Sequence, residues 1–433
     1  MLKLQQDALK IFLAGVKAVS PYVLVAKKIN VSNDELSIDD RNYRLNHNVH
    51  VAAFGKAVLG MVNAIENILS AHIVQGIVSV PCGMVRSKNN LPDENSHIAA
   101  RKIMEMAKTL DCHDILLVLI TGGGSALLSL PVPQITLEEK VKATKVLSNK
   151  GAAIEQLNIV RKHLSLIKGG KLAQAAYPAS VIALILSDVI DDPIDVIACG
   201  PTAPDLTTKT DCVDIVNNLD ASNDIPANIM NYLNCEEQVE TSSVDFNHVY
   251  NVIVGNNVNA IEGASLAAQE LGYKVEVYNT TVRGEAREVG KLYAKLAHMN
   301  SSCGDDEKQS KKSLCIISSG ETTVFVQGNG RGGRNQELAL AAAIEMDKLP
   351  KFKRNALLLS AGTDGQDGPT PAAGAYAFQN LIANATEDGL DPLTHLNYND
   401  TFTFYNGFKG GKYLVKTGLT GTNVMDLHIL LFS

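Results

Sequence analysis

The chain alternates short apolar runs with longer segments in which apolar residues recur every three or four positions. The apolar runs are four to six residues long, a length that favours buried strands over buried helices. They occupy residues 49–54, 75–80, 115–120, 181–186, 249–254, 274–278, 314–317 and 356–360. Helical spacing follows such runs at 57–69 and 338–346. Repeated strand–helix units predict largely parallel sheets with helices on both faces.

A polar stretch at residues 206–245 divides this alternation into two series and predicts an irregular connection. A length of 433 residues is typical of two domains. We therefore predict two α/β domains, a Rossmann-like domain over residues 1–240 and a second over 241–433, each a largely parallel sheet flanked by helices. The charged segment between His298 and Ser313 predicts a surface loop.

Charge and cysteine content restrict the possible partners and compartment. The net charge of −7, without a long basic run, argues against nucleic acid as the main partner. Seven scattered cysteines, none paired as C-x-x-C, favour a reducing compartment. No apolar run reaches 18 residues, so no membrane span is expected. We expect a cytoplasmic or mitochondrial protein, monomeric or homodimeric, that acts on a small molecule.

The densest cluster of glycine and charge is Gly328–Glu337, with four glycines and two arginines. The apolar run Thr322–Val326 stands before it and predicts a strand that leads through a loop into a helix. Such a loop can hold an anion on backbone N–H groups at a helix N-terminus, and arginine adds bidentate binding of an oxyanion. The same loop contains the dinucleotide spacing G-x-G-x-x-G, although the acidic residue expected about 20 positions on is missing. A tight turn is the third interpretation.

Polar residues also follow four predicted strands directly, where open parallel sheets bind their ligands. Lys56 is placed to neutralise phosphate, unless it is an ordinary surface lysine. Gly122, Gly123, Gly124 and Ser125 could cradle phosphate, or could form a turn capped by the serine.

Two carboxylates and a group of cations complete the candidate chemistry. Asp188 and Asp364 could hold Mg²⁺ or take a proton from a hydroxyl, and helix capping is the alternative. Arg161, His163 and Lys168 could bind an acidic substrate or lie on a solvated helix face. Lysine, arginine, glycine loops and carboxylates, without a nucleophile–base pair, suit phosphoryl transfer.

Together these blocks resemble the class II glycerate 2-kinases, whose C-terminal half is called the MOFRL domain. The matching blocks cover nearly the whole chain. They are Phe54–Ala57, Leu91–Glu94, Gly122–Leu128, Val160–Ser165 with Ile167–Gly170, Leu186–Val189, Cys199–Thr202, Ser319–Val324, Gly332–Leu340, Gly362–Thr370 and Thr420–Val424.

The resemblance implies phosphorylation of D-glycerate to 2-phosphoglycerate with ATP and Mg²⁺, in the cleft between two α/β domains. The family's glycine-lysine-alanine lysine falls on Lys56, and its glycine-glycine-arginine-asparagine arginine falls on Arg334. On this interpretation the catalytic residues are Lys56, Arg334 and Asp188. The expected ATP contacts are Gly122, Gly123, Gly124, Ser125, Gly330, Gly332 and Gly333. The expected substrate contacts are Arg161, His163, Lys168 and Asn335, and the expected Mg²⁺ ligands are Asp188 and Asp364.

The chain departs from the family pattern at a few positions. Thr121 and Cys199 stand where the family has serine, and the family glycine after serine-aspartate-valine is replaced around Asp191. The histidine-proline that precedes the block at Pro92 is also lost. Two other functions stay open at this point. One is an NAD(P)H-linked hydroxypyruvate reductase, and the other is a non-catalytic ligand-binding protein of the same fold.

Overall fold

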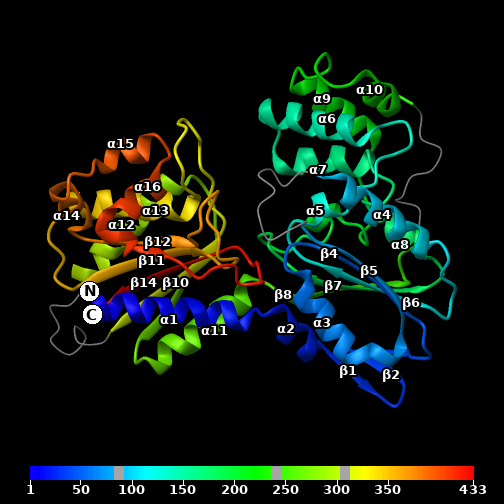
Figure 1. Ribbon diagram of the computed structural model, residues 1–433, viewed down its shortest axis with the longest axis horizontal. Helices are drawn as coiled ribbons and strands as arrows, with labels where there is room; N and C mark the ends of the chain where they lie inside the picture. Colours follow the sequence, from blue (N-terminus) through cyan, green and yellow to red (C-terminus); the bar gives the residue numbers. More distant parts are fainter. Residues whose placement is uncertain (82–91, 236–244, 303–312) are drawn as a thin grey trace. The chain divides into compact units, whose positions relative to one another are not determined.

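The computed structural model describes residues 1–81, 92–235, 245–302 and 313–433. They form two compact units, each drawn in Figure 1 with its own sheet and helices. The N-terminal unit is Pro21–Val254, and the C-terminal unit is Gly255–Ser433 together with Met1–Ser20. The expected boundary after residue 240 falls outside the described residues.

A five-stranded sheet organises the N-terminal unit, in the order β5-β4-β6-β7-β8. Its strands are β4 (Val49–Phe54), β5 (Ile73–Ser79), β6 (Ile115–Ile120), β7 (Ser180–Leu186) and β8 (Val249–Gly255). β4 pairs in parallel with β5 and β6, and β6 pairs in parallel with β7. Every residue of β6 is buried, as expected for a parallel strand covered on both faces. The sequence therefore predicts this sheet correctly.

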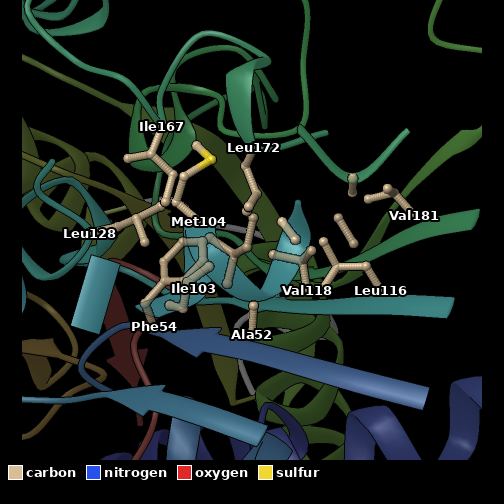
Figure 2. Packing of buried hydrophobic residues seen from close by; sticks show 14 of the residues in the cluster. Ala52, Phe54, Ile103, Met104, Leu116, Val118, Leu128, Ile167, Leu172 and Val181 are labelled. Carbon is tan, nitrogen blue, oxygen red and sulfur yellow. The ribbon is translucent and has the colours of Figure 1, made fainter. Parts of the chain in front are cut away.

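Helices cover both faces of this sheet (Figure 1). α2 (Pro21–Lys28) and α3 (Val58–Leu69) lie on one face, and α4 (Glu94–Ala107) and α8 (Lys171–Ala176) on the other. Alternate residues of the strands point at α4, since successive side chains of a strand face opposite sides. Figure 2 shows Phe54 and Val118 packed against Ile103 and Met104 of that helix. This core holds the strand ends in place.

A layer of four helices extends the N-terminal unit. The helices are α6 (Leu137–Asn149), α7 (Ile154–His163), α9 (Lys209–Asn218) and α10 (Ala227–Leu233), and they share a second hydrophobic core. The expectation of an irregular stretch is wrong where α9 and α10 lie. Thr208 and Asp211 form a capping box at the start of α9, and Ile215 and Val216 are buried in the core. The polar residues there are caps and exposed faces of short helices. The unit also contains an antiparallel sheet of β1 (Ile29–Ser32), β2 (Glu35–Ile38) and β3 (Arg41–Arg44).

A six-stranded sheet organises the C-terminal unit, in the order β13-β12-β11-β14-β10-β9. Its strands are β9 (Lys274–Val282), β10 (Leu314–Gly320), β11 (Ala356–Gly362), β12 (Gly374–Phe378), β13 (Leu414–Val415) and β14 (Asp426–Phe432). Only β9 and β10 pair in parallel, and the other four pairings are antiparallel. The prediction of a largely parallel sheet is wrong here because two strands run against their neighbours: β14 lies antiparallel between β11 and β10, and β12 lies antiparallel between β11 and β13. All seven residues of β14 are buried, so its apolar pattern carries no information on direction.

The first helix belongs to the C-terminal unit. α1 (Leu2–Ala18) packs with α11 (Asn257–Glu270) on one face of the sheet, and α12 (Ala286–Ser302) and α13 (Arg334–Lys348) cover the other (Figure 1). Gly15 lets α1 approach closely, because a Cβ there would stand 2.8 Å from the carbonyl oxygen of Ala260. The division expected for residues 1–240 therefore differs from the observed one at the N-terminus. The remaining helices are α14 (Leu381–Glu387), α15 (Pro392–Asn397) and α16 (Thr401–Gly407).

Two further expectations concern single segments. The strand predicted at 322–326 is wrong, since β10 ends at Gly320 and Thr323 makes only an isolated bridge to Glu285. Most of the surface loop predicted after His298 lies outside the described residues. Of the helices that the structure describes, no single one is long and apolar enough to cross a membrane. α1 and α2 meet that criterion only when counted together.

Candidate active site

Three predicted site segments lie at one edge of the five-stranded sheet. Lys56 follows β4, Gly122–Ser125 follow β6, and Asp188 follows β7. Because these strands are parallel neighbours, their carboxyl ends meet at the same edge, with about 4.8 Å between adjacent strands. The structure thus brings together the lysine, the glycine loop and the carboxylate, as the strand ends predict.

Two glycines shape the backbone around Lys56. Gly55 has φ +139°, and a Cβ there would stand 2.1 Å from the Thr121 Oγ1. Gly123 has φ +83°, and a Cβ there would stand 2.9 Å from the Lys56 Cγ. The lysine N–H donates to the carbonyl of Gly122 at 2.9 Å. The side chain of Lys56 therefore extends over the glycine loop.

The amino group of Lys56 is available to a ligand. The side chain is exposed, and the described residues give its Nζ neither a hydrogen bond nor an ion pair. A compact, fully charged ammonium at the end of a strand can bind a phosphate oxygen without first breaking another contact.

A chain of polar contacts joins the glycine loop to α7. The Ser125 Oγ lies 3.3 Å from the Cys199 Sγ, which donates to the Asn158 Oδ1 at 3.3 Å. The Arg161 Nη1 donates to the same Asn158 oxygen at 3.1 Å. Ala198 and Cys199 both have left-handed backbone angles (φ 54° and 60°), an uncommon conformation for residues other than glycine. Cys199, where the family has serine, thus bridges two predicted ligand-binding segments.

Buried lysines lie next to this chain of contacts. Lys168 is 1% exposed, and its Nζ donates to the carbonyl of Ala198 at 3.2 Å. Burial lowers the pKa of Lys168, the charge of Arg161 lowers it further, and Cys199 opposes both effects. Lys171 donates to two backbone carbonyls, at 2.9 and 2.7 Å.

Lys140 of α6 is a member of this group that the sequence analysis missed. It is 3% exposed, and the charges that act on it are those of Lys168, Cys199, Lys171 and Arg161. The sequence did contain a signal, because positions 140, 143 and 147 share the buried face of α6. A lysine at the first of these positions is out of place on an apolar face.

His163 takes part in a different set of contacts. Its Nε2 lies 3.1 Å from the Thr207 Oγ1 and 3.7 Å from the Asp205 Oδ2. Asp205 is 4% exposed and also pairs with Lys162 at 3.6 Å. This buried network supports the end of α7, and a substrate contact by His163 does not follow from it.

The replacement of the family glycine at Asp191 has a structural explanation. Asp191 has φ 69°, in the left-handed region that favours glycine. Aspartate is among the residues that tolerate this conformation best. The turn after Asp188 therefore keeps its shape.

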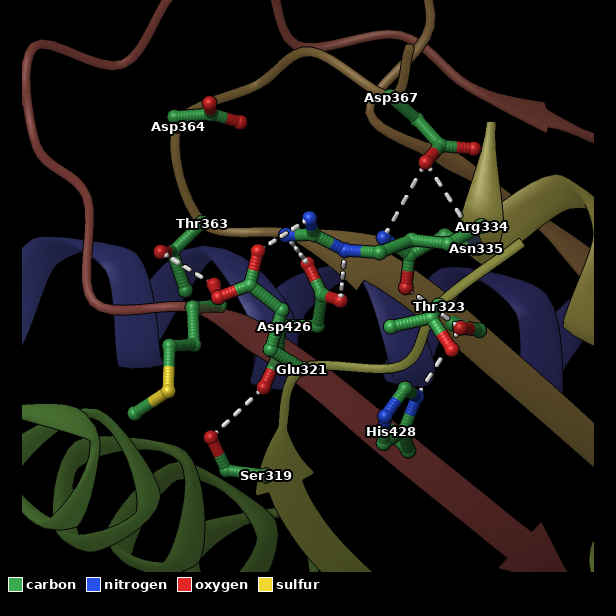
Figure 3. Close-up of polar contacts among 12 residues, drawn as sticks. Ser319, Glu321, Thr323, Arg334, Asn335, Thr363, Asp364, Asp367, Asp426 and His428 are labelled. Carbon is green, nitrogen blue, oxygen red and sulfur yellow. Dashed lines mark hydrogen bonds and ion pairs between the residues drawn. The ribbon is translucent and has the colours of Figure 1, made fainter. Parts of the chain in front are cut away.

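Arg334 organises the candidate site of the C-terminal unit (Figure 3). Its guanidinium donates twice to Asp426, through Nε to Oδ2 at 2.6 Å and Nη2 to Oδ1 at 2.9 Å. The third nitrogen, Nη1, donates to Glu321. Asp426 is fully buried and Glu321 is exposed. Arg334 was predicted as a site residue from the sequence, whereas neither of its carboxylate partners was.

Asp364 lies on the loop that follows β11, near these carboxylates. A Cβ on Gly362 would stand 3.1 Å from the Asp364 Oδ1 and 3.3 Å from the Asp426 Oδ1. Glu321 keeps part of its surface in water, but the loss of water around the rest raises the pKa of its carboxyl; Arg334 lowers this pKa, and Asp426 and Asp364 raise it again. The predicted Mg²⁺ ligand is therefore part of an acidic group with one arginine.

The glycines of the Gly328–Gly333 loop serve close packing. A Cβ on Gly330 would stand 2.4 Å from Asp400, one on Gly332 would stand 2.2 Å from the Thr401 Oγ1, and one on Gly333 would stand 2.3 Å from Asp367. The loop follows no strand, so the strand–turn–helix context of the dinucleotide spacing is missing in this part of the described chain.

Most backbone donors around this loop already have protein acceptors. The N–H groups of residues 327 and 328 donate to Asn399, those of 330 and 331 to Tyr398 and Asp400, and those of 335 and 336 to Asp367. The expectation of bare N–H groups at the start of α13 is therefore wrong for these six positions. The guanidinium groups of Arg331 and Arg334 remain as the positively charged groups of this segment, and Arg334 is paired with Glu321 and Asp426.

Asp367 caps α13 from another loop. Its carboxylate accepts from the N–H groups of Asn335 at 3.0 Å and Gln336 at 2.8 Å. Burial raises the pKa of Asp367 to about 6, against these two hydrogen bonds. The side chain of Asn335 is 1% exposed and bonded to Ser360 and Asp367. These contacts fix the helix that carries Arg334, and the expected substrate contact of Asn335 stays a prediction.

We expect Asp367→Ala to lower the free energy of unfolding by about 2–4 kcal/mol, because two backbone donors lose their acceptor and the Gln336 amide loses a partner. Urea unfolding followed by circular dichroism measures the change. Lys348→Ala, which removes an exposed ion pair of the same helix, is the control and should change it by less than about 0.5 kcal/mol. Equal stability of the two variants would contradict the capping role.

Comparison with known proteins identifies the family. One family model, a domain of unknown function (DUF4147), matches residues 7–234, and the MOFRL family model matches residues 314–426. The glycerate kinase of Rattus norvegicus is 39% identical over 99% of this chain and 93% of its own length. The D-glycerate 2-kinase of Thermotoga maritima is 36% identical over 94% of this chain and 96% of its own. The chain belongs to the glycerate kinase family.

A solved glycerate kinase from Thermotoga maritima agrees with the fold described above. It superposes with a TM-score of 0.83 at 34% identity, and the match covers 100% of both chains. In this member of the glycerate kinase family, Lys56, Ser125 and Asp188 lie in the DUF4147 match. Arg334, Asp364 and Asp426 lie in the MOFRL match. Lys56 and Arg334 thus lie in the matches of two different family models.

Proposed function

We propose that this chain transfers the γ-phosphoryl group of ATP to the 2-hydroxyl of D-glycerate. The observation that carries the proposal is similarity over 94% of this chain to a protein named D-glycerate 2-kinase. The chain also has a lysine at a strand end, Lys56, whose amino group is unpaired among the described residues. In this step the hydroxyl oxygen forms a bond to phosphorus, the bond to the β-phosphate oxygen breaks, and the hydroxyl proton is released. The products are 2-phosphoglycerate and ADP.

Lys56 is the residue we assign to the transferring phosphoryl group. Positioning and charge neutralisation supply most of the catalysis in phosphoryl transfer. The exposed amino group of Lys56 stands over Gly123 and lacks a partner among the described residues. It can therefore follow a phosphate oxygen as negative charge moves toward the leaving group.

Arg334 is assigned a similar role, with its orientation set by the protein. The bidentate contact with Asp426 fixes the plane of the guanidinium. The remaining contact, from Nη1 to the exposed Glu321, is the one that a phosphate oxygen can replace. An arginine held in this way loses little side-chain entropy when it binds an anion.

Asp188 and Asp364 fit the proposed requirement for Mg²⁺. Both are partly buried carboxylates next to a candidate phosphate-binding residue, and carboxylate oxygens are ligands that Mg²⁺ prefers. Within the described ranges no group of three or more acidic, histidine or cysteine side chains gathers as a metal cage. Sites that use ATP seldom need one, because one or two carboxylates and the phosphates hold the ion. When bound, Mg²⁺ would neutralise charge on the β- and γ-phosphates.

Asp188 is also our candidate for the group that accepts the hydroxyl proton. It lies at the same sheet edge as Lys56. A carboxylate that orients and deprotonates the attacking hydroxyl is the usual base in kinases. Arg161 and Lys168 supply positive charge for the carboxylate of the substrate acid.

A coupled assay tests the proposal. Purified protein with D-glycerate, ATP and Mg²⁺ should form ADP, which pyruvate kinase and lactate dehydrogenase report. EDTA should abolish ADP formation; in this control the reaction is first stopped and ADP is measured afterwards. Oxidation of NADH by the purified protein and hydroxypyruvate, with both coupling enzymes left out, would instead support the reductase. Absence of ADP formation with D-glycerate would reject the kinase.

A further inference from the structure

Lys140 is buried without a partner. It is 3% exposed, and no hydrogen-bond acceptor lies within reach of its Nζ among the described residues. An unpaired polar group in a protein interior costs free energy, and an unpaired charge costs more. The cost is compensated if a ligand supplies the missing acceptor.

The groups around Lys140 add positive charge. Lys168, on the loop before α8, Lys171 of α8 and Arg161 of α7 all act on it as cations, and only the thiol of Cys199 opposes them. Among the described residues, Lys168 donates to a backbone carbonyl and Arg161 to the amide oxygen of Asn158, and neither forms an ion pair with a carboxylate. Burial lowers the pKa of Lys140 to about 7, and the neighbouring cations lower it further.

The cluster also reaches the partly exposed glycine loop. Ser125, Arg161 and Lys171 are half-buried, whereas Lys140 and Lys168 are buried. The Ser125 Oγ and the amide of Asn158 are neutral hydrogen-bonding groups next to these cations. A small hydroxy acid carries one carboxylate beside hydroxyl groups, and cations next to neutral hydrogen-bonding groups can bind both.

We infer that Lys140, with Lys168 and Arg161, forms a receptor for an oxyanion of the reactants, and that the carboxylate of the substrate acid occupies it. This inference rests on the proposed function for the identity of the acid. Lys140 then determines specificity for a carboxylate, whereas Lys56 and Arg334 act on the phosphoryl group. A phosphate of ATP is the other oxyanion that the same chemistry could accept.

Replacement of Lys140 by methionine distinguishes binding of the substrate carboxylate from binding of an ATP phosphate. Lys140→Met should raise the KM for D-glycerate at least tenfold and leave the KM for ATP within about twofold. For glyceramide, which lacks the charge, the variant and the wild type should have the same KM. Lys142→Met, at an exposed lysine of the same helix, is the matched control and should behave as the wild type.

Three results would overturn the inference: an unchanged KM for D-glycerate, an equal loss for glyceramide, or a loss for ATP in place of D-glycerate. A wild type that does not phosphorylate D-glycerate rejects the proposed function itself. A wild type that does so, with Lys140→Met unchanged, rejects only the receptor.

Thermal unfolding distinguishes a receptor from a structural lysine. The pKa of Lys140 in the folded chain lies below its ordinary value of 10.5. Below pH 7 the lysine is charged in both the folded and the unfolded chain, and its burial lowers the stability of the ligand-free protein. This loss of stability declines as the pH rises from about 7 toward 10.5. Lys140→Met should therefore have a Tm equal to or above that of the wild type at pH 6, with a smaller difference at pH 9. A lower Tm at both pH values would indicate a structural role and contradict the inference.

Proton uptake gives a second measurement on the unmodified protein. An anion beside Lys140 raises its pKa, so binding of D-glycerate between pH 7 and pH 9 should take up protons. Calorimetry without ATP, repeated in HEPES and Tris, measures the uptake from the difference in binding enthalpy. Lys140→Met should lose it. Binding of D-glycerate by the wild type without proton uptake would contradict the assignment.

Discussion

Lys56→Ala should lower kcat by about 10²–10³-fold, the loss typical when one group that stabilises transition-state charge is removed. The Tm should not change, because the side chain is exposed and forms neither a hydrogen bond nor an ion pair within the described residues. The KM for D-glycerate should change little, since the interaction is made with the phosphoryl group. Steady-state kinetics and a thermal scan on the same preparation measure both quantities.

Two further variants make this result specific. Lys108→Ala removes another exposed lysine of the N-terminal unit and should keep wild-type kinetics. Gly123→Ala keeps Lys56 but places a Cβ 2.9 Å from its Cγ, at a backbone angle that favours glycine. It should lower kcat by displacing the lysine. A kcat for Lys56→Ala within tenfold of the wild type would show that the phosphoryl group is bound elsewhere.

Arg334→Ala should abolish measurable turnover, with a loss of at least about 10³-fold in kcat. It should also lower the free energy of unfolding by about 3–5 kcal/mol, because Asp426 is left buried and unpaired. Arg334→Lys should keep part of the stability and little of the activity, since lysine cannot reproduce the bidentate contact. Urea unfolding and the coupled assay measure the two effects.

A double variant separates catalysis from folding at this position. Arg334→Met combined with Asp426→Leu removes both charges of the buried pair, and such replacements are often neutral for stability. The double variant should therefore recover most of the stability lost in Arg334→Ala and none of the activity. Recovery of both would show that Arg334 acts only through the fold.

Local patterns predicted the N-terminal sheet because each strand is a short, fully buried run between turn residues. In the C-terminal unit, the same pattern of short apolar runs gave a wrong prediction of parallel strands. The run Asp426–Phe432 is buried on both faces, and apolar content alone cannot tell a parallel from an antiparallel central strand. The membership of α1 in the C-terminal unit depends on contacts between residues about 250 positions apart, such as Gly15 with Ala260, which no local pattern encodes.

The site was predictable where a charged residue directly follows a strand. Lys56 and Asp188 lie together at the predicted sheet edge for that reason. Asp426 was missed because an acidic residue at the start of an apolar strand is also an ordinary strand boundary. Its pairing with Arg334 crosses 92 positions. Packing of the Gly328–Gly333 loop against Asp400 and Thr401 accounts for the glycine spacing, so the spacing alone does not identify a ligand motif, and the ATP contacts expected there stay predictions.

The position of the phosphate in the product shows whether this chain is a glycerate 2-kinase. After reaction of the purified protein with D-glycerate, ATP and Mg²⁺, phosphorus NMR of the product should show a monoester resonance coupled to the single methine proton at carbon 2. That pattern identifies 2-phosphoglycerate. Coupling to the two methylene protons at carbon 3, or no new monoester at all, would contradict the assignment of this chain as a glycerate 2-kinase.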